Sequence, residues 1–149
     1  MEIYVDGDAC PVKAEVLRVA RRHRLPVHLV SNSALAGIAD PLIHRVMVDA
    51  GPDAADDWIA SHIGRRDIVV TGDIALAARC LQKGARALAP TGKPFTDDSI
   101  GMALAMRDLN AQLRDSGTLR GGGPGFTTKD RSRFLQALEN TVQALKRGA

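Results

Sequence analysis

Ile3-Tyr4-Val5-Asp6-Gly7-Asp8-Ala9-Cys10-Pro11 opens the chain, and this stretch does most to decide the fold. Its three apolar residues predict a short buried strand, and Pro11 suits the first turn of a helix. Asp6 and Asp8 therefore fall at the carboxyl end of a strand, where open α/β sheets bind ligands. Two carboxylates so close repel each other unless a cation, a proton or hydrogen bonds intervene. A divalent ion such as Mg²⁺ or Mn²⁺ is the simplest resolution, because it takes carboxylate oxygens and bridges to phosphate.

The rest of the chain repeats the order of strand, turn and helix. Apolar runs predict further strands at residues 27–30, 46–48, 68–71 and 87–89. Helical spacing, caps and breakers predict helices at residues 12–23, 53–63, 73–81, 96–114 and 134–145. Residues 34–42 and the glycine-rich stretch 117–125 have the composition of loops. We predict a single α/β domain over residues 1–149, with a mostly parallel sheet of four to five strands and helices on both faces. Its α/β core spans residues 1–115, and the glycine-rich loop and C-terminal helix occupy residues 116–149.

Acidic residues gather where the predicted strands pass into helices. Six carboxylates share this position: Asp6, Asp8, Asp53, Asp56, Asp57 and Asp73. Because parallel strands end at one edge of a sheet, we expect these side chains to converge although they are scattered along the chain. The spacing of Asp53, Asp56 and Asp57 also directs them to the same side of a helix. This coincidence favours a metal site.

Each acidic group also has a purely structural interpretation. Asp at a helix start is favoured by capping and by the helix dipole, so Asp53 and Asp73 taken singly are typical caps. One of Asp56 and Asp57 is expected to be only a solvated residue of the first turn. A lone cap does not require a second carboxylate two residues away, and the metal site is therefore the stronger interpretation for the pair at Asp6.

Several smaller polar residues are candidates for supporting roles. Asn32 follows another strand at the same edge and could place an amide near a phosphate, although turn chemistry alone explains it. Thr71 either bonds its own turn or orients Asp73. Lys13 could approach a phosphate from the first helix or lie in solvent. Cys10 is expected to be a packed or capping residue, because no spacing suggests a catalytic His partner.

Composition limits the classes of function. The chain has 149 residues, 45% of them hydrophobic and only 3% aromatic, which disfavours a binding surface built mainly on base stacking. Its net charge of +3 is uneven: residues 1–106 carry 12 Lys and Arg against 13 Asp and Glu, and residues 107–149 carry 8 against 4. That basic excess suits a polyanionic partner or a solvated helix surface. With two cysteines, no visible secretory signal and no apolar run of membrane-spanning length, we expect a cytoplasmic protein.

Four stretches resemble a known bacterial family. They are residues 5–13 (VDGDACPVK), 53–56 (DAAD), 67–77 (DIVVTGDIALA) and the tail with Gly122-Gly123-Pro124 and Asp130-Arg131. End to end, the chain resembles the uncharacterised YaiI/YqxD family, which is grouped with PIN-like domains. The resemblance implies a PIN-like three-layer sandwich, and many such domains are nucleases that hold Mg²⁺ or Mn²⁺. It assigns the metal-holding roles to Asp6, Asp56 and Asp73, with Asp8 as an additional acid whose role, ligand or support, stays open.

The leading hypothesis is a metal-dependent phosphodiesterase, a hydrolase acting on RNA through these catalytic carboxylates. The basic residues expected to contact the RNA backbone are Arg107, Arg114, Lys129 and Arg131, together with Lys13.

Two alternatives remain open. A strand followed by Asp-x-Asp also resembles haloacid-dehalogenase-type phosphatases, with Asp6 as nucleophile, Asp8 as acid-base and Lys83 or Lys93 as counter-charge. That interpretation leaves Asp53 and Asp56 without a role. The second alternative is a module that binds RNA or protein without catalysis.

Overall fold

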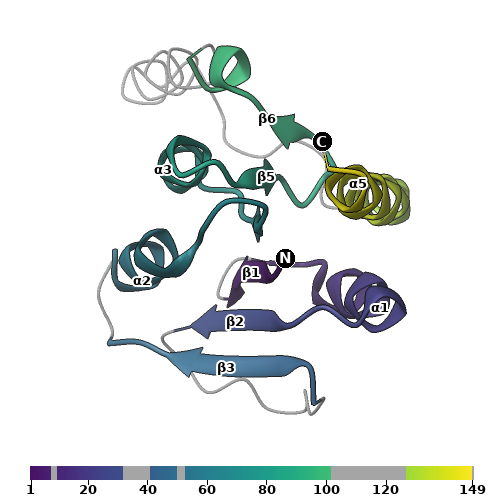
Figure 1. Ribbon diagram of the computed structural model, residues 1–149, viewed down its shortest axis with the longest axis horizontal. Coiled ribbons are helices and arrows are strands. Elements are labelled where there is room, and N and C mark those ends of the chain that lie inside the picture. Colours follow the sequence, from purple (N-terminus) through teal and green to yellow (C-terminus); the bar gives the residue numbers. More distant parts are fainter. Residues whose placement is uncertain (8–9, 32–40, 50–52, 102–126, 149) are drawn as a thin grey trace, which may run out of the picture.

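The computed structural model describes residues 1–7, 10–31, 41–49, 53–101 and 127–148. Within these residues six strands form one sheet in the order β3-β2-β1-β4-β5-β6 (Figure 1). The strands are β1 Ile3–Asp6, β2 Val27–Ser31, β3 Ile43–Met47, β4 Ile68–Val70, β5 Arg86–Leu88 and β6 Pro94–Phe95. Strands β1 to β5 are parallel, and β6 pairs antiparallel with β5. The predicted α/β class with a mostly parallel sheet is confirmed.

The edges of the sheet differ from the prediction. Strand β3 begins at Ile43, three residues earlier than expected, because an edge strand exposes His44 and Arg45 and so lacks a continuous apolar run. The sixth strand was not predicted at all. It contains only Pro94 and Phe95, and proline is tolerated there because β6 lies at an edge.

Helices cover both faces of the sheet. Helices α1 (Lys13–His23) and α5 (Thr128–Lys146) lie side by side on one face, and α2 (Ala54–His62) and α3 (Ile74–Gln82) cover the other (Figure 1). A further helical segment begins at residue 97, where Thr96 and Ser99 exchange hydrogen bonds as the predicted cap. No helix in the described part of the chain is both long and apolar enough to cross a membrane.

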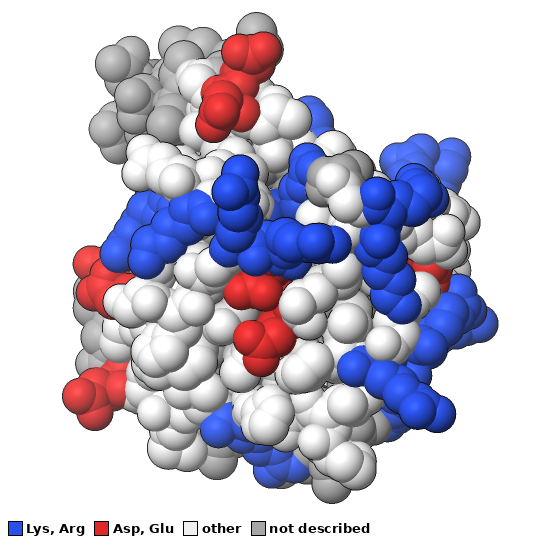
Figure 2. Space-filling model, viewed as in Figure 1, with Lys and Arg blue, Asp and Glu red and all other residues white. Residues whose placement is uncertain are grey.

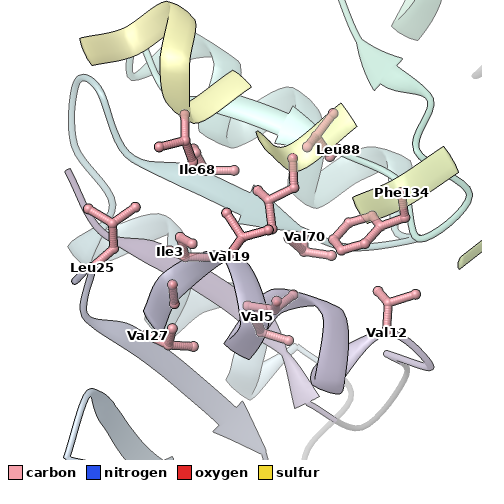
Figure 3. Packing of buried hydrophobic residues seen from close by; sticks show 14 of the residues in the cluster. Ile3, Val5, Val12, Val19, Leu25, Val27, Ile68, Val70, Leu88 and Phe134 are labelled. Atoms are coloured by element: carbon pink, nitrogen blue, oxygen red, sulfur yellow. The ribbon is translucent and has the colours of Figure 1, made fainter. Parts of the chain in front are cut away.

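A hydrophobic core lies on each side of the sheet. Ile3 and Val5 point to the α1 and α5 side, whereas Tyr4 points to the α2 and α3 side, as the two-residue period of a strand requires. Figure 3 shows the first core, in which Val19 of α1 and Phe134 of α5 pack over the strand residues. Because both faces are covered, the central strands β1 and β4 are almost entirely apolar, and the acids lie at their ends.

Helix α5 begins six residues before the predicted start at residue 134. Its apolar spacing begins at Phe134, but the first turn is held by a capping box in which Thr127 and Asp130 bond each other's backbone N–H groups. The start of α5 is therefore determined by its capping residues, which hydrophobic spacing alone does not reveal.

Candidate functional site

The acidic residues meet at the point where the direction of strand addition reverses. From β1 the chain adds β2 and β3 on one side, then returns to place β4 on the other side of β1. In open parallel sheets such a switch point leaves a crevice beyond the carboxyl ends of the two central strands. Asp6 ends β1, Asp73 follows β4, and α2 begins directly after Asp53. Acids from three separate segments therefore lie at this switch point, and we call this region the acidic crevice.

Asp73 is held in place by its own turn. Its side chain caps α3 by accepting a hydrogen bond from the Leu76 N–H at 3.1 Å. The Asp73 N–H in turn donates to Thr71 Oγ1 at 3.0 Å, and Thr71 is buried. Of the two roles predicted for Thr71, bonding its own turn is therefore the one seen, and this bond holds the backbone of Asp73. Asp73 is a cap, as the structural interpretation expected, and it also contacts another carboxyl group.

That second carboxyl belongs to Asp56, in the first turn of α2. Partial burial, together with the negative charges of Asp73 and Asp6, raises the pKa of Asp56 to about 6. A side-chain hydrogen bond with Asp73 and the charge of Asp53 act in the same direction. Asp6, Asp53 and Asp73 therefore lie near enough to Asp56 for their charges to act on it.

The other acids of α2 take different roles. Asp53 occupies the N-cap position but makes no capping hydrogen bond with its exposed side chain, so the capping interpretation does not hold for it. Asp57 is exposed and pairs with Arg79 of α3, with 2.9 Å between Oδ1 and the guanidinium nitrogen. Asp57 is thus the first-turn residue that was expected to lie outside the acidic site.

The described carboxylates do not form a preformed metal cage. No group of three or more His, Cys, Asp or Glu side chains within the described ranges is arranged to hold a metal ion. Instead, two of the acids share a hydrogen bond, which requires one proton between them. Carboxylate oxygens suit Mg²⁺ or Mn²⁺, and a cation that displaced this proton would neutralise the same repulsion. The donor chemistry fits such an ion. Asp8 lies outside the described residues.

Sequence patterns did not assign Cys10 and Glu15 to the site, but Cys10 lies within reach of the charges of both Asp6 and Glu15. Burial raises the pKa of the Cys10 thiol, with the charges of Asp6 and Glu15 contributing and the Val12 N–H and Lys13 opposing. Cys10 is therefore a protonated, packed residue, as expected. Glu15 Oε2 is buried and has no hydrogen-bond partner among the described residues. No spacing signal could have found Glu15, because its position depends on how α5 packs on α1.

The predicted cations divide into two groups. Lys13 Nζ donates to the Cys10 carbonyl at 3.2 Å, and Arg131 donates to the Pro11 carbonyl at 2.7 Å. Both side chains therefore fix the connection between β1 and α1. Lys129 is exposed on the first turn of α5. Asn32, Arg107 and Arg114 lie outside the described residues.

The fold and the acidic crevice define an α/β protein with a mostly parallel sheet and carboxylates gathered at its switch point. A family model described as "Uncharacterized BCR, YaiI/YqxD family" matches residues 4–144, and the chain belongs to that family. It is 63% identical over 146 residues to a UPF0178 protein of Parvibaculum lavamentivorans, covering 98% of this chain and 96% of the relative. A UPF0178 protein of Rhodospirillum rubrum is 60% identical over 149 residues, covering 99% of each chain. No solved structure matches the chain.

Proposed function

We propose that this protein is a Mg²⁺- or Mn²⁺-dependent phosphodiesterase with a PIN-like three-layer sandwich fold, and that its substrate is RNA. One arrangement carries the proposal: Asp6 at the end of β1, Asp56 in the first turn of α2 and Asp73 at the start of α3 lie near one another, and the pKa of Asp56 is raised accordingly by burial and by the two neighbouring charges. Carboxylates that converge from three segments repel one another, and a bound cation would remove this unfavourable interaction. Their position at a switch point is where open α/β sheets place their ligands.

Each acid has a distinct place in the proposed site. Asp6, Asp56 and Asp73 would hold the ion, with Asp8 as a further ligand or a support. A bound ion would activate water and neutralise charge building on the scissile phosphate. The Leu76 N–H bonds the Asp73 carboxylate and Thr71 Oγ1 accepts from the Asp73 backbone N–H, so this ligand needs little rearrangement.

Basic residues would hold the RNA backbone and make its binding dependent on salt. Lys129 is exposed at the start of α5, and Arg131 anchors this start to Pro11 in the connection after β1. Arg131 therefore places positive charge at the connection that follows β1, while its guanidinium holds the two segments together. Arg107 and Arg114 are proposed to extend the same contact.

The phosphatase alternative is the weaker one. Lys83 caps the carboxyl end of α3, whereas Asp73 begins that helix, so Lys83 lies at the opposite edge of the sheet from Asp6. It cannot act there as the counter-charge for a phosphate on Asp6. The interaction of Asp56 with Asp73 and Asp6 also has no role in that mechanism.

The test measures cleavage of single-stranded and structured RNAs by the purified protein with Mn²⁺, with Mg²⁺ and with EDTA. We expect metal-dependent cleavage that falls by at least about 100-fold in Asp6→Asn and Asp73→Asn. Asn is also a good N-cap, so Asp73→Asn should keep α3 intact. Asp57→Asn is the matched control, because it removes a carboxylate one residue from Asp56 but outside the acidic site.

The outcomes separate the alternatives. Equal cleavage by Asp6→Asn, Asp73→Asn and the unchanged protein would point to a contaminating nuclease and contradict the proposal. Binding of Mn²⁺ and RNA without turnover across the panel would indicate a non-catalytic module. A phosphoryl group trapped on Asp6 would establish the phosphatase instead.

A further inference from the structure

A groove of about 420 Å³ lies at the amino-terminal edge of the sheet, away from the acidic crevice. It is formed by the turn before β4, the end of α3, strands β5 and β6, and the last turns of α5. Figure 2 shows Lys and Arg side chains gathered in a band across the part of the surface where Figure 1 places α3, β5 and α5. This edge therefore has the opposite charge character to the site proposed for the metal.

Arginines dominate the lining of the groove. Among the residues that the structure describes, Arg65, Arg66 and Arg86 line it with one acid, Asp97. Arg65 and Arg86 are exposed, and neither forms an ion pair with any residue that the structure describes. Arg66 donates to the Leu145 carbonyl of α5. The groove thus offers two uncommitted guanidinium groups beside a third that ties its walls together.

The backbone holds these arginines on defined turns. Gly84 has φ +85°, and a Cβ there would lie 3.1 Å from Cγ of Arg65, so the glycine lets the Arg65 stem lie against the turn. Arg66 itself has φ +72°, a left-handed conformation stabilised by its bond to α5. Arg86 is fixed at the start of β5 by its N–H bond to the Asp67 carbonyl at 2.9 Å.

We propose that this groove binds the sugar-phosphate backbone of single-stranded RNA as a contact separate from the acidic crevice. Guanidinium groups match phosphate geometry, and uncommitted ones bind it without first breaking an internal ion pair. Leu81 and Phe95 give the groove an apolar wall against which an unpaired base can lie. The groove has the volume of a small-ligand site, which suits a nucleotide or two of a single strand better than a duplex.

Helix α3 runs from one site to the other, and its length gives the distance between them. It begins at the acidic crevice after Asp73 and ends at the groove near Lys83 and Gly84. Nine residues at 1.5 Å each give a separation of about 14 Å along its axis. A strand held in the groove can therefore extend along the molecule toward the acids. The choice of RNA rests on the proposed function.

The experiment measures RNA binding in EDTA, so that it does not depend on metal or on cleavage. A fluorescein-labelled single-stranded RNA of about 12 nucleotides is titrated with protein from 50 to 200 mM salt, and its fluorescence anisotropy is followed. The test variant is Arg65→Gln with Arg86→Gln. Its matched control is Arg18→Gln with Arg45→Gln, two exposed arginines outside the groove, which gives the same change in net charge.

We expect the groove variant to lose affinity by about tenfold at low salt and the control pair by less than about twofold. Two lost phosphate contacts should also lower the slope of log affinity against log salt by about 1.4. Equal losses of affinity in both variants, or no RNA binding by the unchanged protein, would overturn the proposal. It would also be overturned if the protein bound the labelled RNA in duplex form as tightly as the single strand. Because binding is measured in EDTA, the absence of metal-dependent cleavage would not alter this result, so a failure of the catalytic proposal stays distinguishable.

Discussion

Asp56 of α2 and Asp73 at the start of α3 share a hydrogen bond, which joins the two helices at the carboxyl edge of the sheet. Two carboxyl groups can make this bond only while one of them holds a proton. The pKa of Asp56 is raised to about 6 by burial and by the charges of Asp73 and Asp6, so this proton is lost close to neutral pH. Above that pH the site carries an electrostatic cost in the absence of a cation.

The first prediction is that Asp56→Asn stabilises the metal-free protein. At pH 7 Asp56 is charged in both states, but only in the folded state does it lie near other acids. Replacing it with Asn therefore removes an unfavourable interaction from the folded state. We expect the free energy of unfolding to rise by about 1 kcal/mol at pH 7, after allowance for solvent screening. The gain should disappear near pH 4, because folded Asp56 is then protonated. Urea unfolding at both pH values measures it.

Asp57→Asn is the control for this stabilisation. Its carboxylate pairs with Arg79 on the surface, so its loss should change stability by less than about 0.5 kcal/mol at either pH. A destabilised Asp56→Asn at pH 7 would show that the acids do not repel one another in the folded protein.

The second prediction concerns the pH dependence of metal binding. Because a divalent ion must displace the proton of Asp56, affinity for Mn²⁺ should rise by up to about tenfold per pH unit below pH 6 and level off above it. Titration calorimetry in buffers of different ionisation enthalpy should detect the released proton near pH 5.5. Affinity that does not change between pH 5 and pH 7 would exclude Asp56 as a ligand.

How much of the fold and of the acidic site could be predicted from the sequence depended on burial. The central strands are buried on both faces, so their apolar runs located them, and the acids after β1 and β4 followed directly. Strand β3 and the two-residue β6 lie at the edges, where partial exposure removes the apolar signal. Sequence spacing placed Asp56 and Asp57 on one side of a helix but could not choose between them. Only packing of α2 against α3 shows that Asp57 meets Arg79 and Asp56 meets Asp73.

The groove shows a different limit of sequence reasoning. Arg65, Arg66 and Arg86 lie in a part of the chain whose net charge is close to zero, so composition directed attention to the C-terminal third instead. Their grouping depends on two turns at the amino-terminal edge and on the end of α5. Neither the turn conformations nor the docking of a distant helix can be derived from local pattern.

A third prediction contrasts two glycines. Gly92 has φ +89°, and a Cβ there would lie 2.8 Å from backbone atoms of Arg133 in α5, so Gly92→Ala should destabilise the protein by about 2–3 kcal/mol. Gly101 is helical and has open space around its Cα, so Gly101→Ala should stabilise by about 0.5–1 kcal/mol. Thermal unfolding of the two variants should show shifts of opposite sign. A neutral Gly92→Ala would mean that α5 does not press on the turn before β6.

The last prediction concerns the contacts that hold α5 against α1. Glu139 of α5 is buried, and its carboxylate accepts hydrogen bonds from Gln143 at 2.7 Å, from His23 at 2.8 Å and from Arg22 at 2.9 Å. Burial opposes ionisation, but these bonds hold the pKa of Glu139 below its ordinary value. Its contribution to stability is therefore present above that ordinary value and is lost as the pH falls through the lowered one.

Glu139→Ala should accordingly destabilise the protein by about 2 kcal/mol at pH 7, because it leaves His23 and Arg22 without their buried partner. This loss of stability should be smaller in acid, because Glu139 of the unchanged protein is then protonated as well. Gln136→Ala, on the exposed side of the same helix, is the control and should change stability by less than about 0.5 kcal/mol. Urea unfolding at pH 7 and pH 3.5 measures both variants. Arg131 links the start of α5 to Pro11, and Arg66 links its end to the groove. Weaker packing of α5 in Glu139→Ala should therefore also lower the affinity for RNA in EDTA. Unchanged affinity would show that RNA binding does not depend on the packing of α5.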